Sequence, residues 1–151
     1  PAGTGIWLNN CLGEIELNRR GLDAGPPGAR LPSNMAPSLA RRGNDVLAVG
    51  SPGADRITTA MQQFLINFLQ IGMSLADAVA HPRVHVDTSG KVVNLKAEAG
   101  LDLPHVDLPL MVFPDIVMYF GGVGAAVYGK ENGFGVAADP RREGGVFNPD
   151  A

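Results

Sequence analysis

The sequence contains only one cysteine and no long apolar run, and each of these features excludes a class of protein or of site. Because Cys11 is the only cysteine among 151 residues, an internal disulfide and a metal site built from paired cysteines are excluded. No apolar stretch reaches the roughly 18 residues that cross a bilayer. The N-terminus shows no basic region followed by an apolar core, as a signal peptide would. We therefore expect a soluble chain with no membrane partner, while its compartment stays open.

Charge of one sign is not concentrated anywhere in the sequence. The 12 basic and 15 acidic residues give a net charge of −3 without a block of like charges, which argues against a nucleic-acid partner. The histidines, His81, His85 and His105, lack the carboxylate spacing of a zinc motif, so each is expected to be structural. Neither a metal nor an organic cofactor is expected. An apolar fraction of 45% with 18% charged residues is typical of a globular chain.

The apolar pattern predicts two helices, with strands before and after them in the sequence. A nearly continuous apolar run over Asp45–Gly50 predicts a strand buried on both faces. Helical spacing over most of Asp55–Ile71 predicts an amphipathic helix that ends at Gly72. Ser74 is expected to cap a second helix over Leu75–Ala80. The other predicted strands cover Gly3–Asn10, Val84–Val86, Lys91–Glu98, Val123–Tyr128 and Phe134–Ala138, the last two as a hairpin.

This order of elements favours one fold class. Helices and strands are segregated along the chain, which is typical of an α+β fold with a largely antiparallel sheet. The Gly- and Pro-rich segment Asn18–Pro37 is expected to be irregular. Residues 1–151 contain no internal repeat and no flexible linker, so we expect one domain segment.

A Gly/Pro turn between the predicted strand and the first helix is the most informative local feature. The turn, Gly50–Arg56, would bring the first free N–H groups of the helix and the positive end of its dipole to one place. Two amides there could bind an anion. If that anion is the oxygen of a tetrahedral acyl intermediate, the turn is an oxyanion hole. The alternative is a tight turn that serves geometry only.

Several stretches along the chain together resemble one enzyme family. They are Gly5–Asn10, Arg30–Pro37, Gly50–Ile57, His81–Arg83 and Asp139–Arg141, and they follow the family's order. The chain is similar to the γ-glutamyltransferases (γ-glutamyltranspeptidases), which are N-terminal-nucleophile hydrolases. The resemblance implies an αββα sandwich and a precursor that cleaves itself into a large and a small subunit. It also implies that the new N-terminal Thr of the small subunit attacks the γ-glutamyl amide of glutathione or a related compound, and that water or an amine then accepts the acyl group.

The resemblance also implies roles for particular residues. Gly53 and Ala54 align with the pair of residues that supplies the oxyanion amides. Ser33 and Asn34 align with tandem serines that bind the α-carboxylate of the glutamyl group, and both can donate to a carboxylate. The alternative for Ser33 and Asn34 is turn-forming chemistry beside Pro32.

The predicted site for the α-amino group lies in an earlier loop. Glu14 aligns with the acid that binds this ammonium, for which a carboxylate is the fitting partner. Cys11 aligns with a Gln or Glu in the same loop. The alternative for Glu14 is a solvated loop acid. Cys11 as a nucleophile has no support, because no histidine lies near it in the sequence to activate the thiolate.

The chain departs from the family pattern at its start and at the site. The N-terminal Thr segment has no counterpart, and Thr4 matches a later part of the family. Ala54 replaces a glycine, Asn34 a serine, and Cys11 a Gln or Glu. We therefore interpret residues 1–151 as the C-terminal part of a small subunit, which needs the large subunit and the rest of the small subunit for activity. The alternatives are a non-catalytic binding or structural subunit, or an acylase with a different acyl group.

Overall fold

The computed structural model describes residues 3–5, 11–14, 18, 20, 21, 25–31, 33–130 and 133–147. They divide into two units, Pro1–Asn34 and Met35–Ala151. No helix or strand occupies the described part of residues 18–37, as the sequence predicted. The strand predicted over Gly3–Asn10 lies mostly outside the described residues.

The first unit contains a short turn stabilised by an asparagine. A 3-10 turn covers Cys11–Gly13. The side-chain amide of Asn18 donates to the carbonyl oxygens of Cys11 at 2.8 Å and of Glu14 at 3.2 Å. These bonds fix the backbone of the loop that holds Cys11 and Glu14, because a side-chain donor takes the place of secondary-structure partners.

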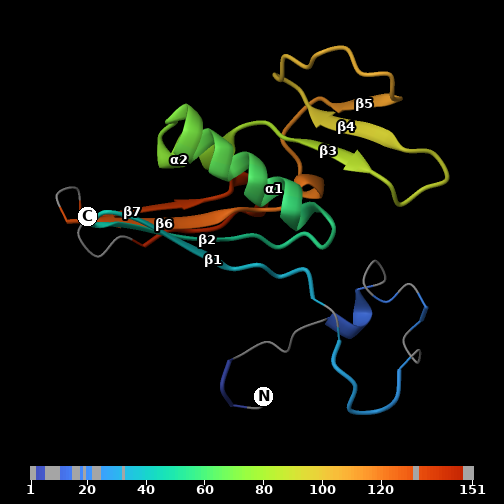
Figure 1. Ribbon diagram of the computed structural model, residues 1–151, viewed down its shortest axis with the longest axis horizontal. Coiled ribbons are helices and arrows are strands. Elements are labelled where there is room, and N and C mark those ends of the chain that lie inside the picture. Colours follow the sequence, from blue (N-terminus) through green and yellow to red (C-terminus); the bar gives the residue numbers. More distant parts are fainter. Residues whose placement is uncertain are drawn as a thin grey trace. The chain divides into compact units, whose positions relative to one another are not determined.

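A four-stranded antiparallel sheet forms the base of the second unit (Figure 1). Its order is β1 (Ser38–Arg42), β2 (Asp45–Gly50), β6 (Gly124–Gly129) and β7 (Gly133–Ala138). The predicted strand over Asp45–Gly50 and the predicted hairpin are confirmed, with small shifts at the hairpin ends. In the sheet, Val49 is opposite Ala125, which is opposite Ala137, so small and medium apolar residues share one face.

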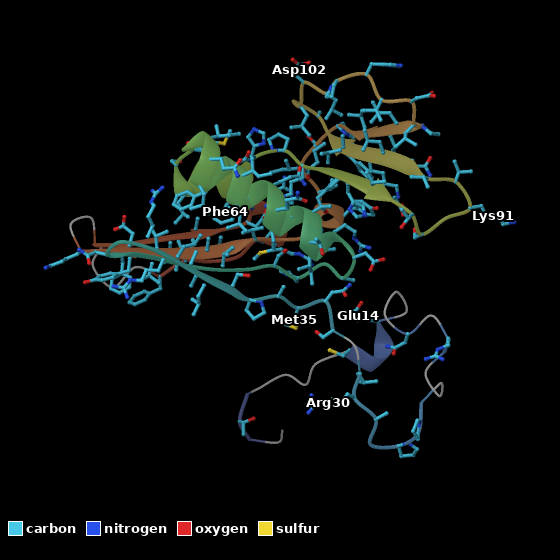
Figure 2. All side chains as sticks on the ribbon, viewed as in Figure 1. Glu14, Arg30, Met35, Phe64, Lys91 and Asp102 are labelled. Carbon is cyan, nitrogen blue, oxygen red and sulfur yellow. The ribbon has the colours of Figure 1, made fainter. Side chains whose placement is uncertain are left out.

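Two helices cover one face of this sheet (Figure 1). Helix α1 (Arg56–Leu65) continues into a π-helical turn, η2 (Ile66–Ile71), and ends at Gly72 with φ 81°. Helix α2 (Leu75–Ala80) begins after Ser74, whose Oγ accepts from the Asp77 amide at 3.1 Å, so the predicted cap is confirmed. Fully buried Phe64 packs from α1 into the core (Figure 2). The buried core consists of Leu47, Val49, Ile57, Ala60, Met61, Phe64, Ala78, Val79, Val123, Ala125 and Ala137.

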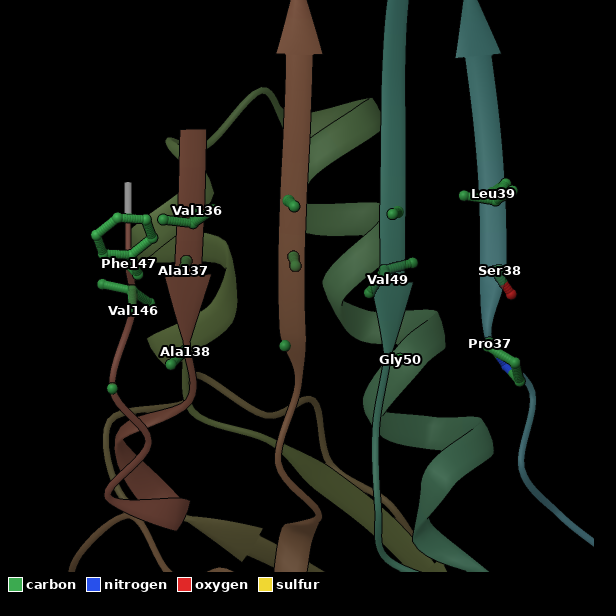
Figure 3. Close-up of a pocket in the computed structure, with 15 residues that line it drawn as sticks. Pro37, Ser38, Leu39, Val49, Gly50, Val136, Ala137, Ala138, Val146 and Phe147 are labelled. Atoms are coloured by element: carbon green, nitrogen blue, oxygen red, sulfur yellow. The ribbon is translucent and has the colours of Figure 1, made fainter. Parts of the chain in front are cut away.

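The other face of the sheet is open, which corrects one prediction. Strand β2 was predicted to be buried on both faces, but only Leu47 and Val49 are buried, while Val46 is 38% exposed. The reason is that the helices cover one face alone. Figure 3 shows the open face, with the helices behind the strands. Apolar side chains line it: Leu39, Val136, Val146 and Phe147, with Ala48 and Ala126 between them.

A smaller three-stranded sheet completes the second unit. Strands β3 (Val84–Asp87) and β4 (Asn94–Glu98) are antiparallel, and β5 (Leu110–Phe113) is parallel to β4. The two predicted strands in this region are confirmed, although β4 begins at Asn94 rather than at Lys91. Strands β1 and β5 were not predicted. None of the described helices is long and apolar enough to cross a membrane.

Candidate functional site

The turn between β2 and α1 has an unusual backbone. Gly53 has φ 132° and Ala54 has φ 47°, so both lie in the region that favours glycine. The carbonyl oxygens of Gly53 and Ala54 accept from the amides of Arg56 (2.9 Å) and Ile57 (3.1 Å), which begins the helix. Within the described part of the chain, the amides of Gly53 and Ala54 donate no hydrogen bond. The turn thus has two amide donors at a helix N-terminus, where donors have no intrahelical partner.

Ala54 carries a conformational cost that glycine would avoid. A left-handed backbone costs an L-residue about 1–2 kcal/mol, while glycine loses about 0.4–1 kcal/mol more chain entropy on folding. We therefore expect Ala54→Gly to raise the free energy of unfolding by about 0.5 kcal/mol. A urea titration measures it. The matched control, Ala76→Gly at an exposed position of α2, should lower stability by about 1 kcal/mol. Destabilisation by both substitutions would contradict the strain at Ala54.

Four charged side chains form a buried network in the second unit. Arg83, Glu98, Asp139 and Arg141 are each at most 6% exposed. Arg83 belongs to one of the stretches that carried the family resemblance, and Asp139 and Arg141 belong to another. No pattern in the sequence indicated that these two stretches meet, and none singled out Glu98.

Each carboxylate of the network is saturated with donors. Asp139 accepts from Arg83 Nη2 and the Val123 amide, both at 2.7 Å, and from the amide and Nη1 of Arg141, both at 3.0 Å. Glu98 accepts from Arg141 Nε and the Arg83 amide, both at 2.8 Å, and from Arg141 Nη2. No buried side-chain polar atom of the described residues lacks a partner. Such satisfaction is what makes buried charge tolerable.

The charges in the network fix each other's protonation. Burial by itself would raise the pKa of Asp139, but Arg83 and the amides of Arg141 and Val123 outweigh it and hold that pKa below its usual value. Burial would lower the pKa of Arg141, yet Glu98 and Asp139 raise it. Two cations therefore face two anions. All four are occupied with one another and with the backbone, so the network is structural rather than a site for a ligand.

A second polar cluster joins α1 to the smaller sheet. Lys96 Nζ lies 2.5 Å from Asp87 Oδ2, to which the Tyr119 hydroxyl donates at 3.3 Å. Lys96 and Ser89 hold the pKa of Asp87 far below its usual value. Lys96 Nζ also lies 4.6 Å from the Tyr119 ring centre, with Arg56 Cζ 5.0 Å from the same centre. These are cation–π distances.

His85 belongs to the same region and is buried against α1. It is 9% exposed, and its Nδ1 lies 3.0 Å from Thr59 Oγ1. Burial, followed by the charge of Arg56, lowers the pKa of His85. Among the described residues, no group of three or more His, Cys, Asp or Glu side chains is placed to hold a metal ion.

The predicted substrate-binding residues lie in the first unit. Cys11, Glu14 and Asn34 are half-buried there, and Ser33 is exposed. Gly53 and Ala54 lie in the second unit. A pocket shared by these residues is therefore still a prediction, as are the roles of all six, Gly53 and Ala54 included.

Comparisons with known proteins give a consistent assignment. The gamma-glutamyltranspeptidase family model matches residues 1–148. Glutathione hydrolase 5 proenzyme of Mus musculus is 38% identical over 97 residues, which is 59% of this chain and 17% of the mouse protein. Acylase ACY 1 proenzyme of Pseudomonas sp. (strain SE83) is 36% identical over 95 residues, which is 62% of this chain and 17% of that protein.

A solved structure shares the fold. The gamma-glutamyltranspeptidase from Pseudomonas nitroreducens complexed with L-DON is 26% identical, with a TM-score of 0.70 over 98% of this chain and 84% of that chain. The fold is thus that of the N-terminal-nucleophile hydrolases, which confirms the predicted α+β class with mostly antiparallel sheets. The chain belongs to the gamma-glutamyltranspeptidase family, as its resemblance predicted. It spans 17% of the length of each of the two curated relatives.

Proposed function

We propose that this chain supplies the oxyanion site and part of the acyl-donor pocket of an enzyme that transfers or hydrolyses γ-glutamyl groups. The observation that carries the proposal is the turn at Gly53 and Ala54. Its two amides donate to no acceptor among the described residues, and they stand at the start of α1. Membership in the gamma-glutamyltranspeptidase family supplies the reaction.

The proposed chemistry proceeds through two tetrahedral intermediates. A Thr hydroxyl outside this chain attacks the γ-carbonyl carbon, and its proton passes to a base, which is the amine of the same Thr. The carbonyl oxygen becomes an anion, and the amides of Gly53 and Ala54 stabilise it. When the intermediate collapses, the C–N bond breaks and the leaving amine takes the proton. Water or an amino group then attacks the ester, and the second intermediate returns the Thr hydroxyl.

Recognition of the γ-glutamyl group needs both charges at its far end to be paired. In the proposal, Glu14 accepts from the α-ammonium, and Ser33 and Asn34 donate to the α-carboxylate. Cys11 lies in the same loop as Glu14 and borders the ammonium site. The loop backbone is fixed by Asn18, which supports a preformed pocket wall.

The test of the donor site is the substitution Glu14→Gln in the complete mature enzyme. Losing a charged hydrogen bond to the ammonium should cost about 1.5–3 kcal/mol, or about 10- to 100-fold in kcat/KM for a γ-glutamyl anilide. The control is Glu143→Gln, which makes the same chemical change at an exposed residue and should leave kcat/KM unchanged. Equal kinetics for the two variants would remove Glu14 from the site.

The second candidate is an acylase with a different acyl group. Two observations favour it: the departures at Cys11, Asn34 and Ala54, and the 36% identity to an acylase proenzyme. A glutaryl anilide lacks the α-ammonium but keeps the terminal carboxylate, so it differs from the γ-glutamyl anilide only at the group that Glu14 is proposed to bind, and it distinguishes the two activities. Preference for the glutaryl compound would favour the acylase. Turnover of neither compound by the complete protein would favour a non-catalytic subunit.

A further inference from the structure

The segment Val117–Val123 packs directly against the turn that holds Gly53 and Ala54. A Cβ built on Gly53 would lie 3.0 Å from Gly121 Cα, and one built on Gly121 would lie 3.0 Å from Ser51 Oγ and 3.1 Å from the Pro52 carbonyl oxygen. Gly121 also has φ 88°, which disfavours a side chain. The two backbones therefore approach as closely as glycine alone allows.

A hydroxyl also bridges the two segments. Ser51 Oγ accepts from the Gly122 amide at 3.2 Å and donates to the Pro52 carbonyl at 2.8 Å. Ser51 thus ties the supporting segment to the carbonyl that precedes Gly53. Because the peptide plane between Pro52 and Gly53 contains both this carbonyl and the Gly53 N–H, holding the oxygen sets the direction of the amide.

The supporting segment is itself bound by side chains along its length. Three successive carbonyls each accept from a different arginine, and the amides at the two ends of the segment each donate to a carboxylate. The carbonyl bonds are Arg56 Nε to Tyr119 (3.3 Å), Arg83 Nη1 to Phe120 (3.0 Å) and Arg142 Nε to Gly121 (3.3 Å). The amide bonds are Val117 to Glu98 (2.8 Å) and Val123 to Asp139 (2.7 Å).

We propose that Ser51 and Gly121 are positioning residues for the oxyanion turn, acting through the segment Val117–Val123. The inference rests on the proposed function, since it needs the Gly53 and Ala54 amides to bind the oxyanion. In this role, neither Ser51 nor Gly121 needs to touch the substrate or the reacting atoms. They keep the amides directed at the place where negative charge develops, and the side-chain bonds along the segment keep the support rigid.

A positioning role predicts a particular kinetic effect. The oxyanion exists only in the intermediates and the flanking transition states, so misdirected amides lower kcat with little change in donor KM. A displacement of about 1 Å at reacting groups can cost about 100-fold. A residue that merely supports the fold would instead lower the amount of folded enzyme, without changing the kcat of what remains.

The first variant is Gly121→Ala in the complete mature enzyme, assayed with a γ-glutamyl anilide. The added methyl must displace Ser51 Oγ, the Pro52 carbonyl or the Ala60 methyl, which lies 3.2 Å from it. We expect kcat per active site to fall by at least about 10-fold, with KM within about 2-fold. The matched control is Gly90→Ala, where the new Cβ makes only ordinary contacts, 3.7 Å or longer. It should keep full kcat.

The second variant covers a failure of the first to fold. Ser51→Ala removes the bridge and adds no bulk, and it should lower kcat by about 3- to 10-fold with an unchanged melting temperature. Its control is Ser38→Ala, which removes a hydroxyl that donates, within the described part of the chain, only to the Ala36 carbonyl at 3.0 Å. Full kcat per active site in Ser51→Ala, or in folded Gly121→Ala, overturns the positioning role.

These measurements distinguish a failure of the positioning role from a failure of the proposed function. Both γ-glutamyl and glutaryl anilides are offered to the unsubstituted enzyme first, and no turnover of either would contradict the proposed function and the positioning role with it. An active enzyme that tolerates both substitutions contradicts the positioning role alone. A fall in kcat for both variants, with both controls at full activity, supports it.

Discussion

Replacement of Arg141 by methionine is expected to lower the free energy of unfolding by about 3–5 kcal/mol. Arg141 donates to Glu98, to Asp139 and to the His81 carbonyl at 3.0 Å, and its side chain is fully buried. Methionine fills much of the space but donates nothing. Two carboxylates would then remain buried with one arginine between them, and an uncompensated buried charge is the costly outcome.

A urea titration of the complete protein measures this loss, because its slope and midpoint give the stability directly. Natural domains are stable by about 5–15 kcal/mol, so the loss approaches unfolding. The control is Arg42→Met at the exposed end of β1, which should change stability by less than about 0.5 kcal/mol. A loss below about 1 kcal/mol in the Arg141 variant would show that the network contributes little.

The same network predicts the direction of a pH effect. The pKa of Asp139 is lower in the folded protein than its ordinary value of 3.8, because Arg83 and two amides outweigh its burial. The unfolded chain therefore binds a proton more readily near that pH. The contribution of Asp139 is fully present above pH 3.8 and is lost as the pH falls through its folded pKa. Asp139→Asn should flatten this part of the stability profile.

The second large effect concerns the 151-residue chain on its own. We expect it to show no enzymatic turnover of a γ-glutamyl anilide, because the proposed nucleophile and its base belong to the rest of the protein. An oxyanion site without a nucleophile retains only a small part of catalysis. Turnover by a clean monomer at an ordinary enzymatic rate would mean that the nucleophile lies within residues 1–151.

We also expect the isolated chain to associate with other copies of itself. The open face of the first sheet presents Leu39, 80% exposed, and Phe147, 84% exposed, beside half-buried Val136. We propose that the remainder of the enzyme covers this face, as an apolar patch of this kind drives association. Light scattering should show oligomers that Leu39→Lys reduces. Val92→Lys, at a residue 57% exposed away from this face, should not reduce them.

Sequence patterns located the elements that local physics specifies. Strand β2, both helices and the β6–β7 hairpin were predicted because apolar periodicity and caps such as Ser74 and Gly72 act within a few residues. Strands β1 and β5 were missed for different reasons. Ser38–Arg42 has no apolar alternation, whereas Leu110–Phe113 is an apolar run of only four residues, too short for periodicity to assign. The π-helical turn was missed because its apolar residues continue the spacing of α1.

The sequence by itself determined the family and the fold class, and it predicted which residues form the candidate site. These depend on short stretches such as Gly50–Ile57, whose residue types are visible without coordinates. Only the tertiary structure decided that Arg83 meets Asp139, that Glu98 meets Arg141, and that Gly121 lies against Gly53. Ion pairing and the close approach of two backbones depend on distance in space. The partners in these three contacts are 43 to 68 residues apart in the chain.

Local sequence patterns do not predict such contacts, because the conditions that make each contact favourable exist only in the folded protein. The low dielectric that strengthens a buried ion pair exists only once the core has formed. The same is true of the space between Gly53 and Gly121, which excludes a methyl group only when the sheet and α1 are in place.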